Sequence, residues 1–237
     1  MSINNPTTLH ILSSSAAMHE SLGNYDLAEP LTFEVMKMKK LVLGLDHPET
    51  LRSMNNLAAI YAKSGKLSEA SVLHLETLAK RKEILGHNHP DTLSSMNNLG
   101  YLYDSQGKYA EAEKMYADCL SKMEKYLGEF HSDTLMVFNN LGYLYKSQGK
   151  YKLAEPLLIS CINKMAATNG ENHPSTLNAV NNLANLHESN AKYAAALPFY
   201  EKCLKGQQII LPENHPIICS LQNRISSCRS MINMMNM

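Results

Sequence analysis

The chain has 237 residues and a formal net charge of zero, because 22 Lys and Arg balance 22 Asp and Glu. This balance argues against a nucleic-acid partner, since nucleic-acid binding depends largely on clustered positive charge and the longest cationic cluster, residues 37–40, is interrupted by Met38. No run approaches the ~18 apolar residues of a membrane span, and residues 1–10 lack the apolar stretch of a signal peptide. We therefore expect neither a membrane segment nor a leader.

A spacing of 42 residues organises almost the whole chain. Histidines, asparagine pairs and single alanines all recur at this spacing. They are His47, His89, His131, His173 and His215; Asn55 with Asn56, Asn97 with Asn98, Asn139 with Asn140 and Asn181 with Asn182; and Ala28, Ala70, Ala112, Ala154 and Ala196. A fixed period of this size is the signature of a solenoid, in which each repeat contacts only its neighbours.

The first copy, about residues 5–44, departs most from the pattern. Ser13, Ser14 and Ser15 stand where later copies have Asn-Asn-Leu. A more polar first repeat is typical of a terminal cap, because one of its faces has no neighbouring repeat. The further copies span about residues 45–86, 87–128, 129–170 and 171–212.

The third copy, residues 87–128, shows the physical logic of the unit. Pro90 suits the first turn of a helix, and Asp91 adds negative charge at the positive end of the helix dipole. Gly107 ends this helix, since glycine tolerates the left-handed conformation beyond a C-cap, and a second helix begins near Tyr109. The apolar stripes are Leu93, Met96, Leu99, Gly100 and Tyr103 in the first helix, and Ala112, Met115, Tyr116, Cys119, Leu120, Met123 and Leu127 in the second. Each unit is therefore predicted to be a pair of antiparallel helices.

The fifth copy has His187 in place of a tyrosine of the first helix and Ala191 in place of the turn glycine. After this copy, another first-helix pattern opens without a second helix to follow it. We predict a capping helix over residues 213–231 and a frayed tail over residues 232–237. Residues 1–231 are predicted to form one solenoid domain.

The repeat resembles the tetratricopeptide repeat, whose signature runs across two helices. The matching residues are Leu99, Gly100, Tyr103, Ala112 and Tyr116. Ordinary tetratricopeptide repeats have about 34 residues, whereas the 42-residue unit, with its His-Pro-x-Thr-Leu start and its Gln-Gly-Lys-Tyr turn, is similar to the kinesin-light-chain type. The resemblance covers roughly residues 5–226. It implies an all-α fold, a right-handed superhelical solenoid of antiparallel helix pairs.

The resemblance also implies a non-catalytic scaffold that binds an extended peptide segment of a partner protein in its concave groove, as kinesin light chains bind cargo. It places the peptide-contacting residues at Arg52, Asn55, Lys63, Asn97, Tyr101, Asp104, Asn139, Tyr143, Lys146, Asn178, Asn181 and Asn185, with Ser94, Met136 and Glu188 on the same face. An asparagine amide offers donors and an acceptor together, so a ladder of them can clamp a peptide main chain. We predict that the first asparagine of each pair contacts the ligand and that the second supports helix packing. Charges of both signs in this set argue against a preference for acidic peptides.

No residue pattern predicts catalysis, a cofactor or a metal site. The repeated histidines are expected to order the loop beside the proline, and His87 with His89, the closest histidine pair, lacks a third ligand. The phosphate-binding Gly-x-x-x-x-Gly-Lys-Ser/Thr motif is absent. Cys119, Cys161 and Cys203 occupy one repeat position, ~8–10 Å or more apart in stacked helices, beyond the ~4.4–6.8 Å Cα separation of a disulfide. Free thiols favour a reducing, cytoplasmic location.

Two other functions fit the same pattern. One is a self-assembling structural spacer whose groove stays empty, and the other is a recognition module of a larger motor-adaptor or signalling assembly. The chain lacks the heptad coiled coil by which a kinesin light chain joins its heavy chain, so we do not predict a kinesin subunit. The predicted partner is a protein or peptide, with self-association as the alternative, and neither nucleic acid nor membrane is expected.

Overall fold

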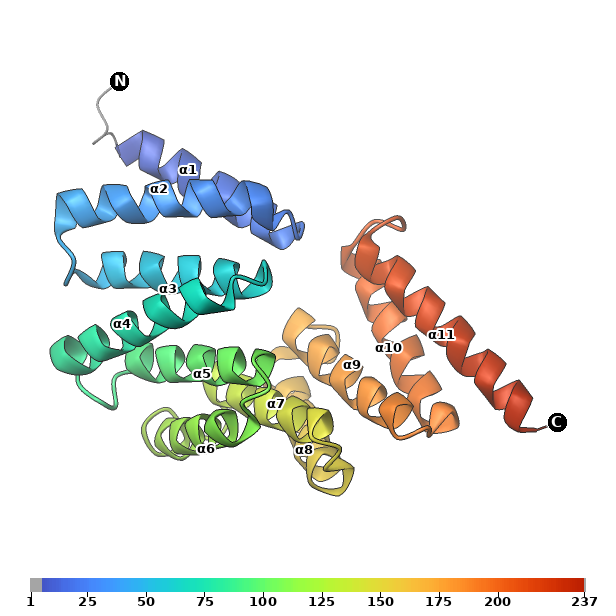
Figure 1. The fold of residues 1–237 in the computed structure, drawn as a ribbon. Helices are drawn as coiled ribbons and strands as arrows, with labels where there is room; N and C mark the ends of the chain where they lie inside the picture. The colour runs from blue at the N-terminus through green and yellow to red at the C-terminus, as the bar shows by residue number, and fades with distance from the viewer. Residues whose placement is uncertain (1–5, 237) are drawn as a thin grey trace. The chain divides into compact units, whose positions relative to one another are not determined.

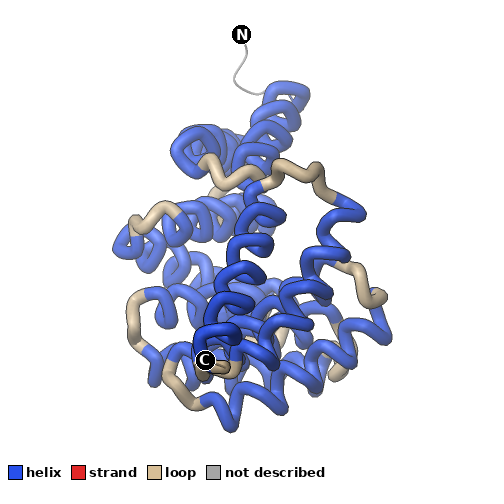
Figure 2. The backbone as a smooth tube through the Cα atoms, turned by 90° about the vertical axis from the view of Figure 1, so that its right-hand side faces the viewer, coloured by secondary structure: helices blue, strands red, loops and turns tan. Residues whose placement is uncertain are grey.

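The protein is described here by a computed structural model that covers residues 6–236. In this range the regular secondary structure consists of eleven α-helices without a strand (Figure 1, Figure 2). The helices are α1 (Pro6–Ser21), α2 (Tyr25–Leu43), α3 (Pro48–Lys63), α4 (Leu67–Leu85), α5 (Pro90–Ser105), α6 (Tyr109–Tyr126), α7 (Ser132–Ser147), α8 (Tyr151–Asn169), α9 (Pro174–Ser189), α10 (Tyr193–Ile210) and α11 (Pro216–Met235). The predicted all-α fold is confirmed. The last helix ends at Met235, beyond the predicted limit of residue 231.

The contacts between helices divide the chain into two compact units, Met1–Lys122 and Met123–Met237. In the first unit α1 packs on α2, α2 on α3, α3 on α4 and α4 on α5. In the second unit α7 packs on α8, α8 on α9, α9 on α10 and α10 on α11. The first helices of successive repeats also contact each other: α3 contacts α5, and α7 contacts α9. The predicted stack of helix pairs is therefore confirmed within each unit, and the single domain over residues 1–231 stays a prediction.

A histidine caps each first helix after α1. Its Nδ1 atom accepts a hydrogen bond of 3.1 or 3.2 Å from the backbone N–H two residues later, which satisfies one of the N–H groups that a helix start leaves unpaired. The capping residues are His47, His89, His131, His173 and His215. The predicted role of these histidines in ordering the loop is confirmed, and capping is the mechanism.

A left-handed residue turns the chain between the two helices of each repeat. After α5 this residue is Gly107, with a φ of +72°, and the Lys108 N–H closes the turn on the Tyr103 carbonyl at 2.8 Å. In the fifth copy the same position holds Ala191, with a φ of +55°, and the Lys192 N–H makes the corresponding 2.8 Å bond. The turn therefore keeps its geometry in the fifth copy, although the left-handed conformation is unfavourable for a residue with a Cβ atom such as Ala191.

Replacing Ala191 by glycine should raise the free energy of unfolding by about 0.5–1 kcal/mol. The left-handed conformation costs an L residue about 1–2 kcal/mol, and the greater unfolded-state entropy of glycine offsets about 0.5–1 kcal/mol of the gain. Urea denaturation followed by circular dichroism measures the change. Gly149→Ala, at the equivalent turn of the fourth copy, should shift stability in the opposite direction. A less stable Ala191→Gly protein would contradict the explanation.

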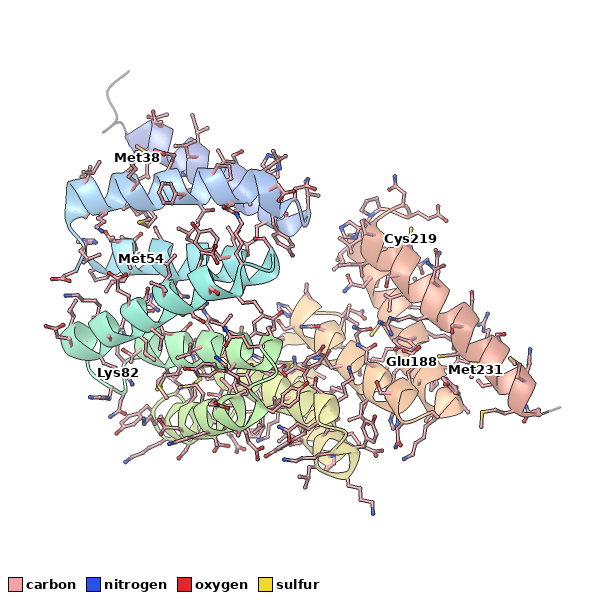
Figure 3. All side chains as sticks on the ribbon, in the orientation of Figure 1. Met38, Met54, Lys82, Glu188, Cys219 and Met231 are labelled. Carbon is pink, nitrogen blue, oxygen red and sulfur yellow. The ribbon has the colours of Figure 1, made fainter. Side chains whose placement is uncertain are left out.

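The cores of the third and fourth copies depend on a small residue in the first helix that faces a large one in the second. In the third copy Tyr116, which is fully buried, lies against Gly100. A Cβ atom added at Gly100 would lie 2.7 Å from Cε1 and 2.9 Å from Cδ1 of that ring. Met38 on α2 and Met54 on α3 are also buried (Figure 3), and the flexible side chain of methionine adapts to irregular spaces in a core.

Replacing Gly100 by alanine should therefore lower the free energy of unfolding by about 1–2 kcal/mol. Overpacking a well-filled core costs about 1–3 kcal/mol, and the higher helix propensity of alanine returns about 1 kcal/mol. The same change should cost less in a Tyr116→His background, because that pair recreates Ala58 with His74 of the second copy. Equal losses in the two backgrounds, measured by urea denaturation, would show that the ring contact is not the cause.

The repeated cysteines are buried and bonded as thiols. The Sγ atoms of Cys119, Cys161 and Cys203 each donate to the carbonyl of a leucine 26 residues earlier, at 3.2, 3.2 and 3.3 Å. Burial raises the pKa of the Cys161 and Cys203 thiols to about 12. These groups therefore act as small core residues with a weak donor rather than as nucleophiles.

Candidate peptide-binding surface

The predicted site residues lie on α3, α5, α7 and α9, and they differ widely in exposure. Arg52, Lys63, Tyr101, Tyr143 and Asn178 are exposed; Asp104, Lys146, Asn181 and Asn185 are half-buried; Asn55, Asn97 and Asn139 are buried. The set is therefore not one uniform surface. Three of its asparagines belong to the packing between helices.

The first asparagine of three pairs lies inside the helix layer. Asn55, Asn97 and Asn139 are only 8%, 5% and 4% exposed. Asn55 Oδ1 lies 3.1 Å from Nδ1 of the buried His74, and Asn139 Oδ1 accepts a 3.0 Å hydrogen bond from Asn182 Nδ2. This exposure differs from the expectation that the first asparagine faces a ligand. The amides instead satisfy polar groups between helices, as burial requires.

The second asparagine of each pair is the more accessible one in the first three pairs. Asn56 is exposed, and Asn98 and Asn140 are half-buried. In the sequence, Asn97 follows Leu93 by four residues and therefore shares its buried side of α5, whereas Asn98 precedes the exposed Tyr101 by three. Helical spacing thus carried the signal for these positions, which the assignment from the family resemblance did not use.

These accessible positions form a strip on each unit that we call the first-helix face. It is defined in the first unit by Arg52, Asn56, Lys63, Asn98 and Tyr101, and in the second unit by Asn140, Tyr143, Asn178, Asn182 and Asn185. Except for Lys63, these residues occupy three shared repeat positions, and each unit presents amides and an exposed ring.

The two cations of the first-helix face in the first unit, Arg52 and Lys63, are paired within the chain. Arg52 bonds to the Glu49 carboxylate, which also accepts from Lys39 at 3.0 Å. The hydrogen bond from Arg52, followed by the one from Lys39, lowers the pKa of Glu49. Lys63 donates to Glu20 at 2.8 Å. These contacts leave little unbalanced positive charge on this part of the face.

In the second unit a buried tyrosine joins α9, α10 and α11 at the edge of the face. The Tyr200 hydroxyl lies 2.7 Å from Asn185 Oδ1, contacts the Glu188 carboxylate and accepts from Arg224 at 3.1 Å. Arg224 also donates to Glu188 at 2.6 Å. Burial, followed by the hydrogen bond to Glu188, raises the pKa of Tyr200, so the phenol remains a donor.

The first-helix face of the second unit combines an exposed ring with a cation. Tyr143 presents its ring with the Lys146 ammonium 4.8 Å from the ring centre. Among residues 6–236 no three His, Cys, Asp or Glu side chains are placed to share a metal ion. No helix in the same range is long and apolar enough to cross a membrane.

These features define a helical-repeat protein with a polar and aromatic face on its first helices, a class typical of interaction scaffolds. Tetratricopeptide-repeat family models match residues 8–49, 50–91, 92–133 and 133–208. The chain belongs to the tetratricopeptide-repeat family.

Comparison with solved structures also finds tetratricopeptide-repeat proteins, and it supports the kinesin-light-chain-like type of repeat. A Podosopora anserina protein described as a kinesin light chain with nearly identical repeats is 26% identical over 85% of this chain and 95% of that one, with a TM-score of 0.63. BtubC (BKLC) of P. vanneervenii shares the fold at 19% identity, with a TM-score of 0.60 over 100% of this chain and 93% of that one. A Rap protein crystallised with competence and sporulation factor also shares the fold. It is 13% identical, with a TM-score of 0.62 over 95% of this chain and 65% of that one. No curated protein matches the sequence.

Proposed function

We propose that the protein is a non-catalytic scaffold that binds an extended peptide segment of a partner protein on the first-helix face of its units. The observation that carries this proposal is the pair Tyr101 and Tyr143. They occupy the same repeat position and remain 45% and 36% exposed in helices whose other aromatic residues are more buried. Packing within the repeat does not need these rings, whereas a bound segment gains apolar area and a hydrogen-bonding tip from them.

Main-chain recognition fits the neighbours of these rings. Asn98 and Asn140 precede them by three residues, so each amide lies on the same side of its helix as the ring. An amide can donate to a peptide carbonyl and accept from a peptide N–H. Because Arg52 and Lys63 are paired with Glu49 and Glu20, we infer that the segment is selected by its backbone and apolar side chains more than by negative charge.

Peptide-display selection against the intact chain tests this function with a matched pair of variants. The test variant carries Tyr101→Ala and Tyr143→Ala. The control carries Tyr109→Ala and Tyr126→Ala, which remove rings of similar exposure, 39% and 50%, from the ends of α6. We expect selected peptides to bind the control like the wild type and to bind the test variant at least about 10-fold more weakly, since losing a contact ring costs about 1.4 kcal/mol or more.

Other outcomes would overturn the proposal. Equal loss in both variants would place binding elsewhere or reflect unspecific adhesion to rings. If no peptide is selected and light scattering shows a mass that grows with concentration, the protein is the self-assembling spacer. Circular dichroism confirms that each variant keeps its helical content.

The proposed setting is the cytoplasm. The buried, hydrogen-bonded thiols of Cys119, Cys161 and Cys203 support it, because they serve the core in reduced form. Imaging of a fluorescent fusion tests the location directly.

A further inference from the structure

The first unit contains a pocket that the other repeats fill with their own side chains. It measures about 240 Å³ and lies between α1, α2 and α3. Its walls include Ala16, Val35 and Thr32, and its polar rim includes Glu20 and Asn56. The pocket is larger than the apolar cavity of about 150 Å³ that holds a benzene molecule in a protein core.

The repeat register explains why this space is open. Thr32 occupies the position that later copies fill with larger buried side chains, namely His74, Tyr116, Leu158 and Tyr200. Ser13, which also lines the pocket, stands where later copies have the first asparagine of the pair. The first copy therefore lacks both the large side chain and the amide that its equivalents have.

The fifth copy shows what such a site holds when it is full. There the Tyr200 ring is buried beside Ala184, and its hydroxyl contacts the Glu188 carboxylate. In the first copy the position of Ala184 is Ala16 and that of Glu188 is Glu20. The first copy therefore keeps the small apolar residue and the carboxylate that surround the Tyr200 phenol in the fifth copy, but it has no tyrosine of its own at this position.

The third copy repeats this association of an acid with a tyrosine. Asp104 occupies the position of Glu20 and Glu188, and burial, followed by the negative charge of Asp104, raises the pKa of Tyr116. The second and fourth copies have Ala62 and Lys146 there, and they have no tyrosine in the second helix position. Of the three copies that have an acid at this position, the third and the fifth also have the tyrosine, and only the first lacks it.

We propose that the pocket at Thr32 binds a phenol ring, the side chain of a tyrosine in a segment bound to the first unit, with its hydroxyl donating to Glu20. A hydrogen bond to a carboxylate is stronger than one between neutral groups. Lys63 donates a hydrogen bond of 2.8 Å to Glu20 Oε1. A carboxylate has about four acceptor sites, so Glu20 can accept a second hydrogen bond from the phenol. Only the source of the ring, a bound segment, rests on the proposed function.

Methyl NMR of the intact chain with p-cresol as the probe tests the pocket. We expect shifts at the Ala16 and Val35 methyl groups, and at least about 10-fold weaker binding of 4-methylanisole, which has no hydrogen to donate to Glu20. Thr32→Tyr should fill the pocket with the chain's own ring, abolish p-cresol binding and raise the melting temperature. Thr32→Val leaves the space open and should keep binding, and Glu20→Gln should weaken it about 10-fold.

The outcomes separate the pocket from its occupant and from the first-helix face. Equal binding of p-cresol and 4-methylanisole, or unchanged p-cresol binding by both Thr32→Tyr and Glu20→Gln, would overturn the proposal. A short capped peptide with a central tyrosine should shift the same methyl groups, and its phenylalanine twin should bind more weakly. If p-cresol binds and the tyrosine peptide does not, the occupant is a free phenol and the segment is rejected. The double variant Tyr101→Ala, Tyr143→Ala should bind p-cresol like the wild type, because neither residue lines the pocket. This result is expected whether or not the variant loses peptide binding.

Discussion

Truncating Tyr200 to alanine should lower the free energy of unfolding of the second unit by about 3–5 kcal/mol. Removing a buried aromatic side chain loses its transfer free energy and leaves a cavity. Tyr200 is fully buried and packs in one cluster with Val180, Ala184, Leu221 and Ile225. Truncation would also take a hydroxyl partner from Glu188.

Tyr200→Phe separates packing from hydrogen bonding. It keeps the ring and removes the contacts to Asn185, Glu188 and Arg224, so it should cost about 1–2 kcal/mol. Urea denaturation with a probe in the second unit measures both variants. If phenylalanine cost as much as alanine, the hydroxyl network rather than the buried ring would hold α9, α10 and α11 together.

Lowering the pH from 6.5 to 4 should destabilise the first unit by about 3 kcal/mol through His74 alone. Burial, followed by the positive charge of Arg81, lowers the pKa of His74 to about 4. In the unfolded chain an imidazole binds its proton near pH 6.5. Between pH 6.5 and pH 4 the unfolded state binds more protons at His74 than the folded state, so the free energy of unfolding falls as the pH falls. The loss is complete below both pKa values.

His74→Leu isolates this contribution, because leucine is the residue at the same position of the fourth copy. The variant should be somewhat less stable at pH 7, where Asn55 loses its partner, and should lose about 3 kcal/mol less than the wild type on acidification. Urea denaturation at pH 7, 5.5 and 4 gives the two curves. Parallel curves for the two proteins would mean that the His74 imidazole protonates normally in the folded state.

Period and turn chemistry were enough to predict the helix pairs. The prolines, the Asn-Asn-Leu pattern and the glycines recur together, so local preferences and the solenoid pattern agree at almost every position. The histidines were assigned to the loop from their spacing, but their capping bonds depend on the orientation of one ring nitrogen. That detail comes from three-dimensional structure.

The asparagine pairs show the limit of an assignment from the family resemblance. The first asparagine of each pair was expected to contact a ligand, yet Asn55 and Asn139 bond to His74 and Asn182, which lie 19 and 43 residues away in the sequence. Such partners belong to other helices, and no local pattern reveals them. The position of Asn55 four residues after the buried Leu51 was the available signal, since both lie on one side of α3.

The pocket at Thr32 was visible in the sequence only as two small residues in a degenerate repeat. Whether small residues leave a space depends on whether neighbouring helices close it. Lys39 and Arg52 reach the pocket from α2 and α3, but both are held by Glu49, and the space remains. This outcome could not be derived from residue sizes alone.

Photo-crosslinking of a selected peptide to the intact chain tests the central claim most directly. A benzophenone group placed in the peptide should attach to residues of the first-helix face, near Tyr101 in the first unit or Tyr143 in the second, as mapped by mass spectrometry. Competition by the unmodified peptide should remove these products. Crosslinks confined to the outer sides of α4, α6 and α8 would contradict the proposed surface and assign binding to the second helices.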